Sequence, residues 1–211
     1  MEAHVHELPW QSIYKLLIGA VLPRPIGWIS TLNENGTPNL APFSFFNAVC
    51  GNPPTVLFCP ELRGTDLAIK DTLKNVRQTG EFVVNIVTES LAQAMVKTSA
   101  ELPEDVDEFQ FAGLGKAPSV IVKAPRVAAS PVHFECRLNQ IITISHQPGG
   151  GSIVIGEVVH VHVSPEVLFG GDKINPAALN AIGRMGGMTY CRTTDLFDMQ
   201  RPPSQIKPAG G

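Results

Sequence analysis

Lys70, Asp71 and Thr72 are consecutive polar residues at the expected start of a helix that ends at Gly80. The first turn of a helix carries unpaired backbone N–H groups and a partial positive charge, to which a lysine ammonium and a threonine hydroxyl add further donors. Such a group of donors can hold one phosphate. An ordinary capped helix explains the same residues, with Asp71 as the N-cap and Lys70 solvated, so both interpretations stay open at this stage.

A second segment of mixed chemistry runs from Asn39 to Ala48 and contains three phenylalanines, one serine and two asparagines. It combines flat apolar surface with polar edges, as part of a binding site would. A barrel strand with phenylalanines in the core accounts for the same residues equally well.

Histidines and a cysteine are the other residues that could do chemistry. His160 and His162 alternate along one expected strand and share a face, and with His133 they could form a metal site. No carboxylate or thiolate ligand is evident near the pair, so we interpret them as partly exposed strand histidines and predict no metal. Cys136, beside Glu135, has no evident base and is interpreted as a small buried hydrophobic residue.

The common local signatures of catalysis are absent from the chain. It contains no G-x-G-x-x-G, no G-x-x-x-x-G-K-[ST], no H-E-x-x-H and no G-x-S-x-G. Dinucleotide-binding, P-loop, zinc-protease and serine-hydrolase interpretations therefore have no local support. We predict no catalytic side chain.

The apolar pattern predicts more strands than helices. Strands are expected over residues 26–31, 38–46, 55–59, 81–87, 132–145 and 152–163, with Asn35-Gly36 as the turn between the first two. Helices are expected over residues 10–19, 70–80 and 89–102, and an acidic loop over 104–108. This order favours an antiparallel barrel with a few helices packed outside it.

Length and charge limit the function classes. The 211 residues (22.7 kDa) favour a single domain over 1–211, with a disordered tail over 203–211. With 16 basic and 19 acidic residues, the net charge of −3 gives no electrostatic surface for nucleic acid or anionic lipid. Neither an export signal nor a membrane span is evident, and the four cysteines form no C-x-x-C pair, so we expect reduced thiols and a cytoplasmic protein.

Several motifs, taken together in order, carry a family resemblance. They are Arg24-Pro-Ile-Gly-Trp-Ile-Ser-Thr31, Gly36-x-x-Asn39-Leu-Ala-Pro-Phe-Ser-Phe-Phe-Asn47, Asn52-Pro-Pro, Lys70-Asp-Thr72-x-x-Asn75, Gly80-Glu-Phe-Val-Val-Asn85 and Glu135-Cys136. This set resembles the flavin reductase-like family of FMN-binding split barrels. The resemblance extends from about residue 13 to residue 202 with order and spacing kept, so it is more specific than any one motif.

The resemblance implies a mainly β fold, a six-stranded antiparallel Greek-key split barrel with a few peripheral helices. It also implies a homodimer, with FMN near the dimer interface. Thr31 and the segment Ser44, Phe45, Phe46 and Asn47 would lie along the flavin, and Lys70, Asp71 and Thr72 would form its phosphate end. Asp71 suits such a site only if it caps the helix and points away. The segment from Arg184 to Tyr190 is left unassigned.

The function implied by the resemblance is oxidoreduction. NAD(P)H would deliver a hydride to flavin N5, and the reduced flavin would serve an oxygenase or another electron acceptor. The cofactor would carry the chemistry, which agrees with the absence of catalytic motifs. Two alternatives stay open: a flavoredoxin-like electron carrier that holds FMN without NAD(P)H turnover, and a non-redox binding barrel.

Overall fold

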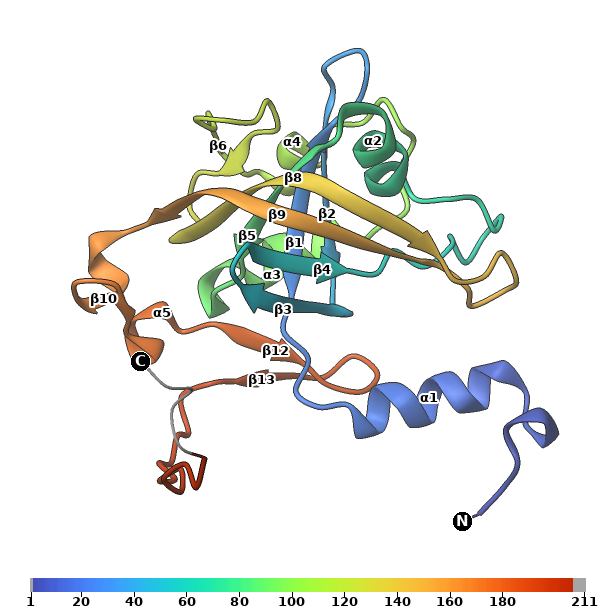
Figure 1. Ribbon diagram of the computed structural model, residues 1–211. Coiled ribbons are helices and arrows are strands. Elements are labelled where there is room, and N and C mark those ends of the chain that lie inside the picture. The colour runs from blue at the N-terminus through green and yellow to red at the C-terminus, as the bar shows by residue number, and fades with distance from the viewer. Residues whose placement is uncertain (1, 207–211) are drawn as a thin grey trace.

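A computed structural model describes residues 2–206, and its main feature is one antiparallel sheet of seven strands (Figure 1). In the order in which they pair, the strands are β2 (Pro38–Phe43), β1 (Gly27–Leu32), β5 (Glu81–Ile86), β8 (Val132–Thr143), β9 (Ser152–Val163), β4 (Pro54–Phe58) and β3 (Phe46–Gly51). The predicted mainly β class with few helices is confirmed, although the sheet has seven strands and not six.

The two edge strands of this sheet are neighbours in the sequence. Only Ser44 and Phe45 separate β2 from β3, so the prediction of one strand over residues 38–46 is wrong. The chain must turn at this point because β2 pairs with β1 while β3 pairs with β4. So short a connection holds the two edges close together. The sheet therefore curls into a barrel that is split between β2 and β3.

Large apolar side chains fill the barrel interior. Phe58 and Phe82 are fully buried there, with ring centroids 5.3 Å apart. A Cβ at Gly156 would clash with the Phe82 ring, so this glycine makes room for the ring. Helix α2 (Asp71–Thr79) packs Leu73 and Val76 into the same core. The helix start is thereby fixed against the strands.

A second core lies on the other face of β1, beneath the 3₁₀ turn η2 (Glu89–Leu91) and helices α3 (Ala92–Lys97) and α4 (Glu108–Ala112). The Trp28 indole donates a 2.8 Å hydrogen bond to the Thr98 hydroxyl, which donates one of 2.8 Å to the Met95 carbonyl. These bonds fix the chain as it leaves α3. The helix predicted over 89–102 is consequently shorter than expected.

Helix α2 begins at Asp71, one residue earlier than expected if Asp71 were its N-cap. The Lys70 carbonyl accepts the N–H groups of Leu73 and Lys74 at 2.9 and 3.1 Å, which makes Lys70 the N-cap and Asp71 the first helical residue. The N-cap prediction for Asp71 is therefore wrong, and no side chain caps this helix. Gly80 ends α2 as predicted, with φ of +69°.

The remaining elements surround the barrel. Helix α1 (Trp10–Ala20), preceded by η1 (Val5–Glu7), confirms the helix predicted over 10–19 and extends away from the sheet (Figure 1). The predicted acidic loop over 104–108 leads into α4, whose N-cap Asp107 accepts two backbone N–H groups. The other short elements are β6 (Lys116–Ala117), β7 (Arg126–Val127), η3 (Pro165–Val167), β10 (Leu168–Gly170), β11 (Lys173–Ile174), α5 (Pro176–Leu179), β12 (Ile182–Arg184) and β13 (Tyr190–Arg192).

The end of the chain has no regular structure where it is described. Residues 203–206 are exposed and belong to no helix or strand, and residues 207–211 of the predicted disordered tail lie outside the described residues. Within residues 2–206, no helix combines the length and the apolar character needed to cross a membrane.

Candidate functional site

A cavity of about 450 Å³ lies beside the split of the barrel. Its walls include residues 42–45 at the end of β2 and in the turn that follows, Met95 of α3, Tyr14 of α1, and Arg184 and Tyr190 of the β12–β13 hairpin. The Tyr14 and Phe45 rings have centroids 6.5 Å apart, and the Arg184 guanidinium lies 4.4 Å from the centre of the Tyr190 ring. Aromatic walls with a cation at the rim suit a planar aromatic ligand.

The Arg24 guanidinium holds the walls of this cavity together. It donates to the carbonyls of Ile18 and Val21 at the end of α1, at 2.6 and 3.0 Å, and to the Met185 carbonyl at 2.8 Å. A longer bond of 3.4 Å reaches the Ser44 hydroxyl. Arg24 is buried. It therefore positions α1, the β12–β13 hairpin and the connection after β2 relative to one another. Nothing near Arg24 in the sequence indicated this role, although Arg24 opens the first motif.

A smaller cavity of about 70 Å³ adjoins the larger one, and Lys70 lines both. Arg63, Asp71 and Thr72 also line it. Among residues 2–206, the backbone N–H groups of Asp71 and Thr72 find no hydrogen-bond acceptor. These free donors, the positive end of the α2 dipole and the cations Lys70 and Arg63 favour an anion. The carboxyl groups of Asp71, Glu101 and Glu108 line the same cavity and oppose it. Asp71 neither caps α2 nor lies outside the cavity, so the condition under which it would suit a phosphate site is not met.

The structure brings five predicted site residues together around the two cavities. Ser44, Phe45 and Lys70 line the larger cavity. Lys70, Asp71 and Thr72 line the smaller one. Because Lys70 belongs to both walls, a single ligand with a flat ring and an anionic end could extend through the junction.

Three predicted residues lie outside the walls of these two cavities. Thr31 is fully buried and accepts a 3.0 Å hydrogen bond from Nδ2 of Asn75. Phe46 packs its ring on Gly27, where a Cβ would lie 2.6 Å from Cδ2 of the ring. Asn47 is exposed on β3. Direct contact of these three side chains with a ligand stays a prediction.

Glu108 is a wall residue of the smaller cavity that the sequence analysis missed. Its buried carboxyl accepts a 3.2 Å hydrogen bond from the Leu40 N–H. Burial raises the pKa of Glu108 to about 7; hydrogen bonds from the backbone of Glu108 and Leu40 oppose the rise, while Asp71 and Asp107 add to it. The only sequence feature that could have indicated Glu108 is the N-cap Asp107 before it, and this segment was predicted as part of an acidic loop.

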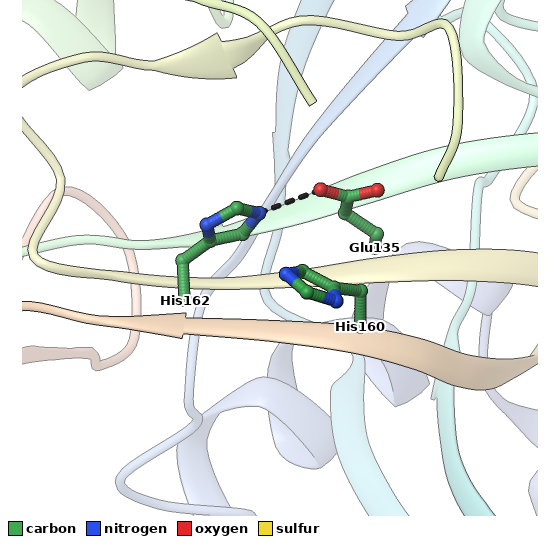
Figure 2. A group of neighbouring side chains, drawn as sticks. All are labelled: Glu135, His160 and His162. Carbon is green, nitrogen blue, oxygen red and sulfur yellow. Dashed lines mark hydrogen bonds and ion pairs between the residues drawn. The ribbon is translucent and has the colours of Figure 1, made fainter. Parts of the chain in front are cut away.

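A separate polar cluster joins β8 and β9. Figure 2 shows His160, His162 and Glu135, and Nε2 of His162 donates to Oε1 of Glu135 at 2.6 Å. The two histidines share a face as predicted, but the prediction that no carboxylate lies near them is wrong. The strand register places Glu135 opposite His160, and sequence alone could not supply that register.

This cluster has the ligand types of a metal site, with one ligand atom of each residue within 4.8 Å of the others. The Glu135 carboxylate also accepts the backbone N–H groups of residues 120–122 at 2.7, 2.6 and 3.0 Å. Each carboxylate oxygen thus accepts two hydrogen bonds. A cation would have to displace one of these donors, so the geometry favours a structural role.

Two further residues singled out from the sequence are buried near this cluster. Nε2 of His133 lies 2.9 Å from the Val127 carbonyl, and burial lowers the pKa of His133 to about 4. Cys136 is fully buried as predicted, and burial raises the pKa of its thiol well above the ordinary value. A thiol in this state is a poor nucleophile.

Comparisons with known proteins agree with the fold. Residues 19–180 match the model of the flavin reductase like domain family. A protein from Aquifex aeolicus is 40% identical over 91% of this chain and 95% of its own length.

Two solved structures are similar over nearly all of both chains. Nitrilotriacetate monooxygenase component B from Bacillus cereus superposes with a TM-score of 0.89 at 30% identity, covering 94% of this chain and 98% of its own. The 2-nitrobenzoate 2-nitroreductase NbaA from Pseudomonas fluorescens gives 0.85 at 32% identity and covers both chains completely. The family model, the split barrel and the paired cavities lead to one conclusion: the chain belongs to the flavin reductase like domain family.

Proposed function

We propose that the chain binds FMN in the two adjoining cavities and catalyses NAD(P)H-dependent flavin reduction. The observation that carries the proposal is the junction at Lys70, where an aromatic cavity meets a cationic helix start with free N–H groups. The residues present fit the cofactor. Phe45 and Tyr14 offer flat apolar surface for the ring, while Lys70 and Thr72 offer donors for the phosphate.

The side chains around the cavities would bind and orient the cofactor. When bound, FMN would supply the redox chemistry, because its ring accepts a hydride at N5 from NAD(P)H and passes the electrons to an acceptor. The aromatic walls would exclude water from one side of the site. Arg24 would keep those walls in place through its bonds to α1 and to Met185. No acid or base side chain is needed for hydride transfer of this kind.

An oxygenase is the proposed acceptor of the electrons. The proposal is supported by the similarity to a protein that is itself described as a component of nitrilotriacetate monooxygenase. A nitro compound is the second candidate acceptor, because the structure similar over its whole length is described as a nitroreductase. We favour the oxygenase.

Anaerobic absorption spectroscopy tests the function directly. FMN added to the purified protein should bind, and NADH or NADPH should then bleach the flavin absorption near 450 nm by roughly the full amount expected for a two-electron reduction. Bound FMN that neither nucleotide bleaches would contradict the reductase and identify a flavoredoxin-like carrier. Failure to bind FMN at all would contradict both and favour a non-redox barrel.

A homodimer is part of the same proposal. Strand β3 is an edge strand that is exposed from residue 47 to residue 51, and α1 has no buried residue, with Leu16 and Leu17 50% and 52% exposed. A second copy would cover this apolar surface beside the larger cavity. Light scattering at micromolar concentration should give twice the chain mass of 22.7 kDa. A monomer with flavin bound would contradict the dimer.

The cytoplasm stays the proposed compartment. All four cysteines are free, as expected for a protein kept in a reducing environment. Labelling with a thiol reagent under denaturing conditions immediately after lysis checks this, because all four thiols are then accessible and only those oxidised in the cell would fail to react.

A further inference from the structure

The side-chain amide of Asn39 lies between the Thr72 hydroxyl and the Glu108 carboxyl, in the wall of the smaller cavity. The three residues are only 8%, 1% and 8% exposed, in that order. Buried polar groups need hydrogen-bond partners, and water has little access here. Each proton on these three groups must therefore face an acceptor on one of the others or in the cavity.

The Asn39 amide can be hydrogen-bonded in two orientations. In the first, Nδ2 donates to Oγ1 of Thr72 at 2.9 Å and Oδ1 faces Oε1 of Glu108 at 3.3 Å. In the second, Nδ2 donates to Oε1 of Glu108 at 3.3 Å and Oδ1 accepts the Thr72 hydroxyl at 2.9 Å. The amide atom beside Thr72 also lies 3.2 Å from the Leu40 nitrogen and 3.3 Å from Oγ1 of Thr31. The second orientation, in which Oδ1 accepts the Leu40 N–H as well, is therefore the better satisfied of the two while Glu108 is ionised. In the first orientation the Leu40 N–H keeps only its bond to Glu108.

Each orientation determines where two protons lie. When Oδ1 of Asn39 accepts from Thr72, the hydroxyl proton is used and Glu108 can be ionised. When Nδ2 donates to Thr72, the hydroxyl proton is free to point into the cavity. The Asn39 oxygen then faces a Glu108 oxygen, and this contact is favourable only if Glu108 carries a proton and donates it.

The charges around Glu108 make both of its protonation states accessible near neutral pH. Its surroundings are Asp107 on the same helix, Lys116 paired with Asp107 at 2.6 Å, Asp71 on α2, and the cavity-lining Lys70, Arg63 and Glu101. Burial is the main reason that the pKa of Glu108 rises to about 7. The carboxyl can therefore respond to a change at Thr72 without a large cost.

We propose that Asn39 couples the binding of an anion at Thr72 to the uptake of one proton by Glu108. The inference rests on the proposed function, in which the FMN phosphate is this anion. A phosphate oxygen accepts the Thr72 hydroxyl proton, so Asn39 must turn and donate Nδ2 to Thr72. Glu108 then takes a proton from solvent and donates it to Oδ1 of Asn39. No covalent bond forms or breaks apart from this protonation.

The coupling predicts how pH affects ligand affinity. Above the pH at which Glu108 ionises in the free protein, each further pH unit should weaken FMN about tenfold, because the bound state retains one more proton. Riboflavin lacks the phosphate, so its affinity should not follow this dependence. A phosphomonoester keeps its dianionic form above its second pKa of about 6, so pH 7 to 9 isolates the protein group.

Calorimetry with the unmodified protein tests the proposal first. FMN is titrated at pH 8 in two buffers of different ionisation enthalpy, and the difference gives the number of protons taken up. We expect about one proton for FMN and none for riboflavin. Normal FMN binding without proton uptake would overturn the coupling alone. Absence of FMN binding at every pH would contradict the proposed function, and the coupling with it.

Substitutions at Thr72 separate this relay from direct repulsion between Glu108 and the phosphate. Thr72→Val removes the hydroxyl and should abolish the pH dependence, whereas Thr72→Ser keeps the hydroxyl and should retain it. Glu108→Gln should also bind FMN without pH dependence. Direct repulsion acts through space and needs no hydroxyl. A pH dependence that survives in Thr72→Val would therefore overturn the role of Asn39.

Discussion

Nε2 of His162 and Oε1 of Glu135 lie 2.6 Å apart across the neighbouring strands β9 and β8, and the Glu135 carboxylate is fully buried. The same carboxylate accepts the N–H groups of residues 120–122. One side chain thus attaches an irregular segment to the two longest strands of the barrel. Because the Glu135 carboxylate is charged, buried and hydrogen-bonded, it should contribute strongly to the free energy of unfolding.

Glu135→Ala should lower the free energy of unfolding by about 3–5 kcal/mol, because it removes the acceptor of one histidine and three backbone donors. Urea or guanidinium unfolding measures the loss. The matched control is His160→Ala, on the same cluster but with no hydrogen bond to Glu135 among those described, which should cost less than about 1 kcal/mol. Equal losses in the two variants would contradict the anchoring role.

Acid should destabilise the protein in two separate steps. Folding depresses the pKa of His133 from 6.5 to about 4 by burial, so the folded state favours the neutral ring. Stability from His133 is then lost as pH falls from about 6.5 to about 4. Burial of Glu135 would raise its pKa, but bonds from His162 and residues 120–122 outweigh burial and lower it to about 2. Its contribution is lost only below about pH 4.5.

His133→Gln tests the first step. The glutamine amide can still reach the Val127 carbonyl but does not titrate, so the variant should lose less stability than the native chain between pH 6.5 and 4.5. Glu108 acts in the opposite direction over this range. Because folding raises its pKa, protonation of Glu108 adds to the free energy of unfolding as pH falls, and this contribution is lost as pH rises. Comparing the two proteins at each pH cancels that contribution. Parallel pH profiles would rule out His133 as the cause.

Local patterns were sufficient to place Lys70 and Thr72 at the start of a helix, although they left its role in anion binding open. Lys70 and Thr72 stand at the start of a nine-residue helix whose stop, Gly80, is also local, and α2 forms almost where the pattern places it. The strand pattern predicted the antiparallel barrel, and the family resemblance supplied the association of these residues with Ser44 and Phe45. Those four residues line the two cavities.

Contacts that depend on distant register could not be predicted in the same way. Arg24 bonds to Met185, 161 positions along the chain, and nothing near either residue indicates the other. The Glu135–His162 pair depends on the alignment of β8 with β9, which shifts between Glu135 and Cys136. The division of residues 38–46 into two strands depends on their different partners, because the apolar pattern itself continues through the turn.

Arg24→Lys should weaken FMN and riboflavin alike, by about tenfold each. A lysine keeps the charge but cannot reach the carbonyls of α1 and Met185 at once, so the walls of the larger cavity lose their common support. Quenching of flavin fluorescence measures both affinities. Arg77→Lys, on the exposed side of α2, is the control and should leave both unchanged. A loss confined to FMN would place Arg24 at the phosphate and contradict this role.

Lys70→Ala should weaken the binding of FMN but not that of riboflavin. Lys70 is proposed to contact the FMN phosphate, and a charged hydrogen bond of this kind contributes about 1.5–3 kcal/mol, so FMN affinity should fall about ten- to a hundredfold. Riboflavin should be nearly unaffected, because it has no phosphate. At saturating FMN, hydride transfer should stay close to that of the native protein, since the reacting atoms keep their positions.

The control for Lys70→Ala comes from the same helix. Lys74 pairs with Glu104 at 2.5 Å and lines neither the larger nor the smaller cavity, so Lys74→Ala removes one positive charge from α2 without touching the proposed site. It should leave FMN affinity within about twofold at physiological ionic strength, because the Lys74 charge is exposed, paired with Glu104 and screened by salt. If Lys70→Ala weakened FMN and riboflavin equally, Lys70 would be supporting the ring or the fold, and the phosphate would have to bind elsewhere.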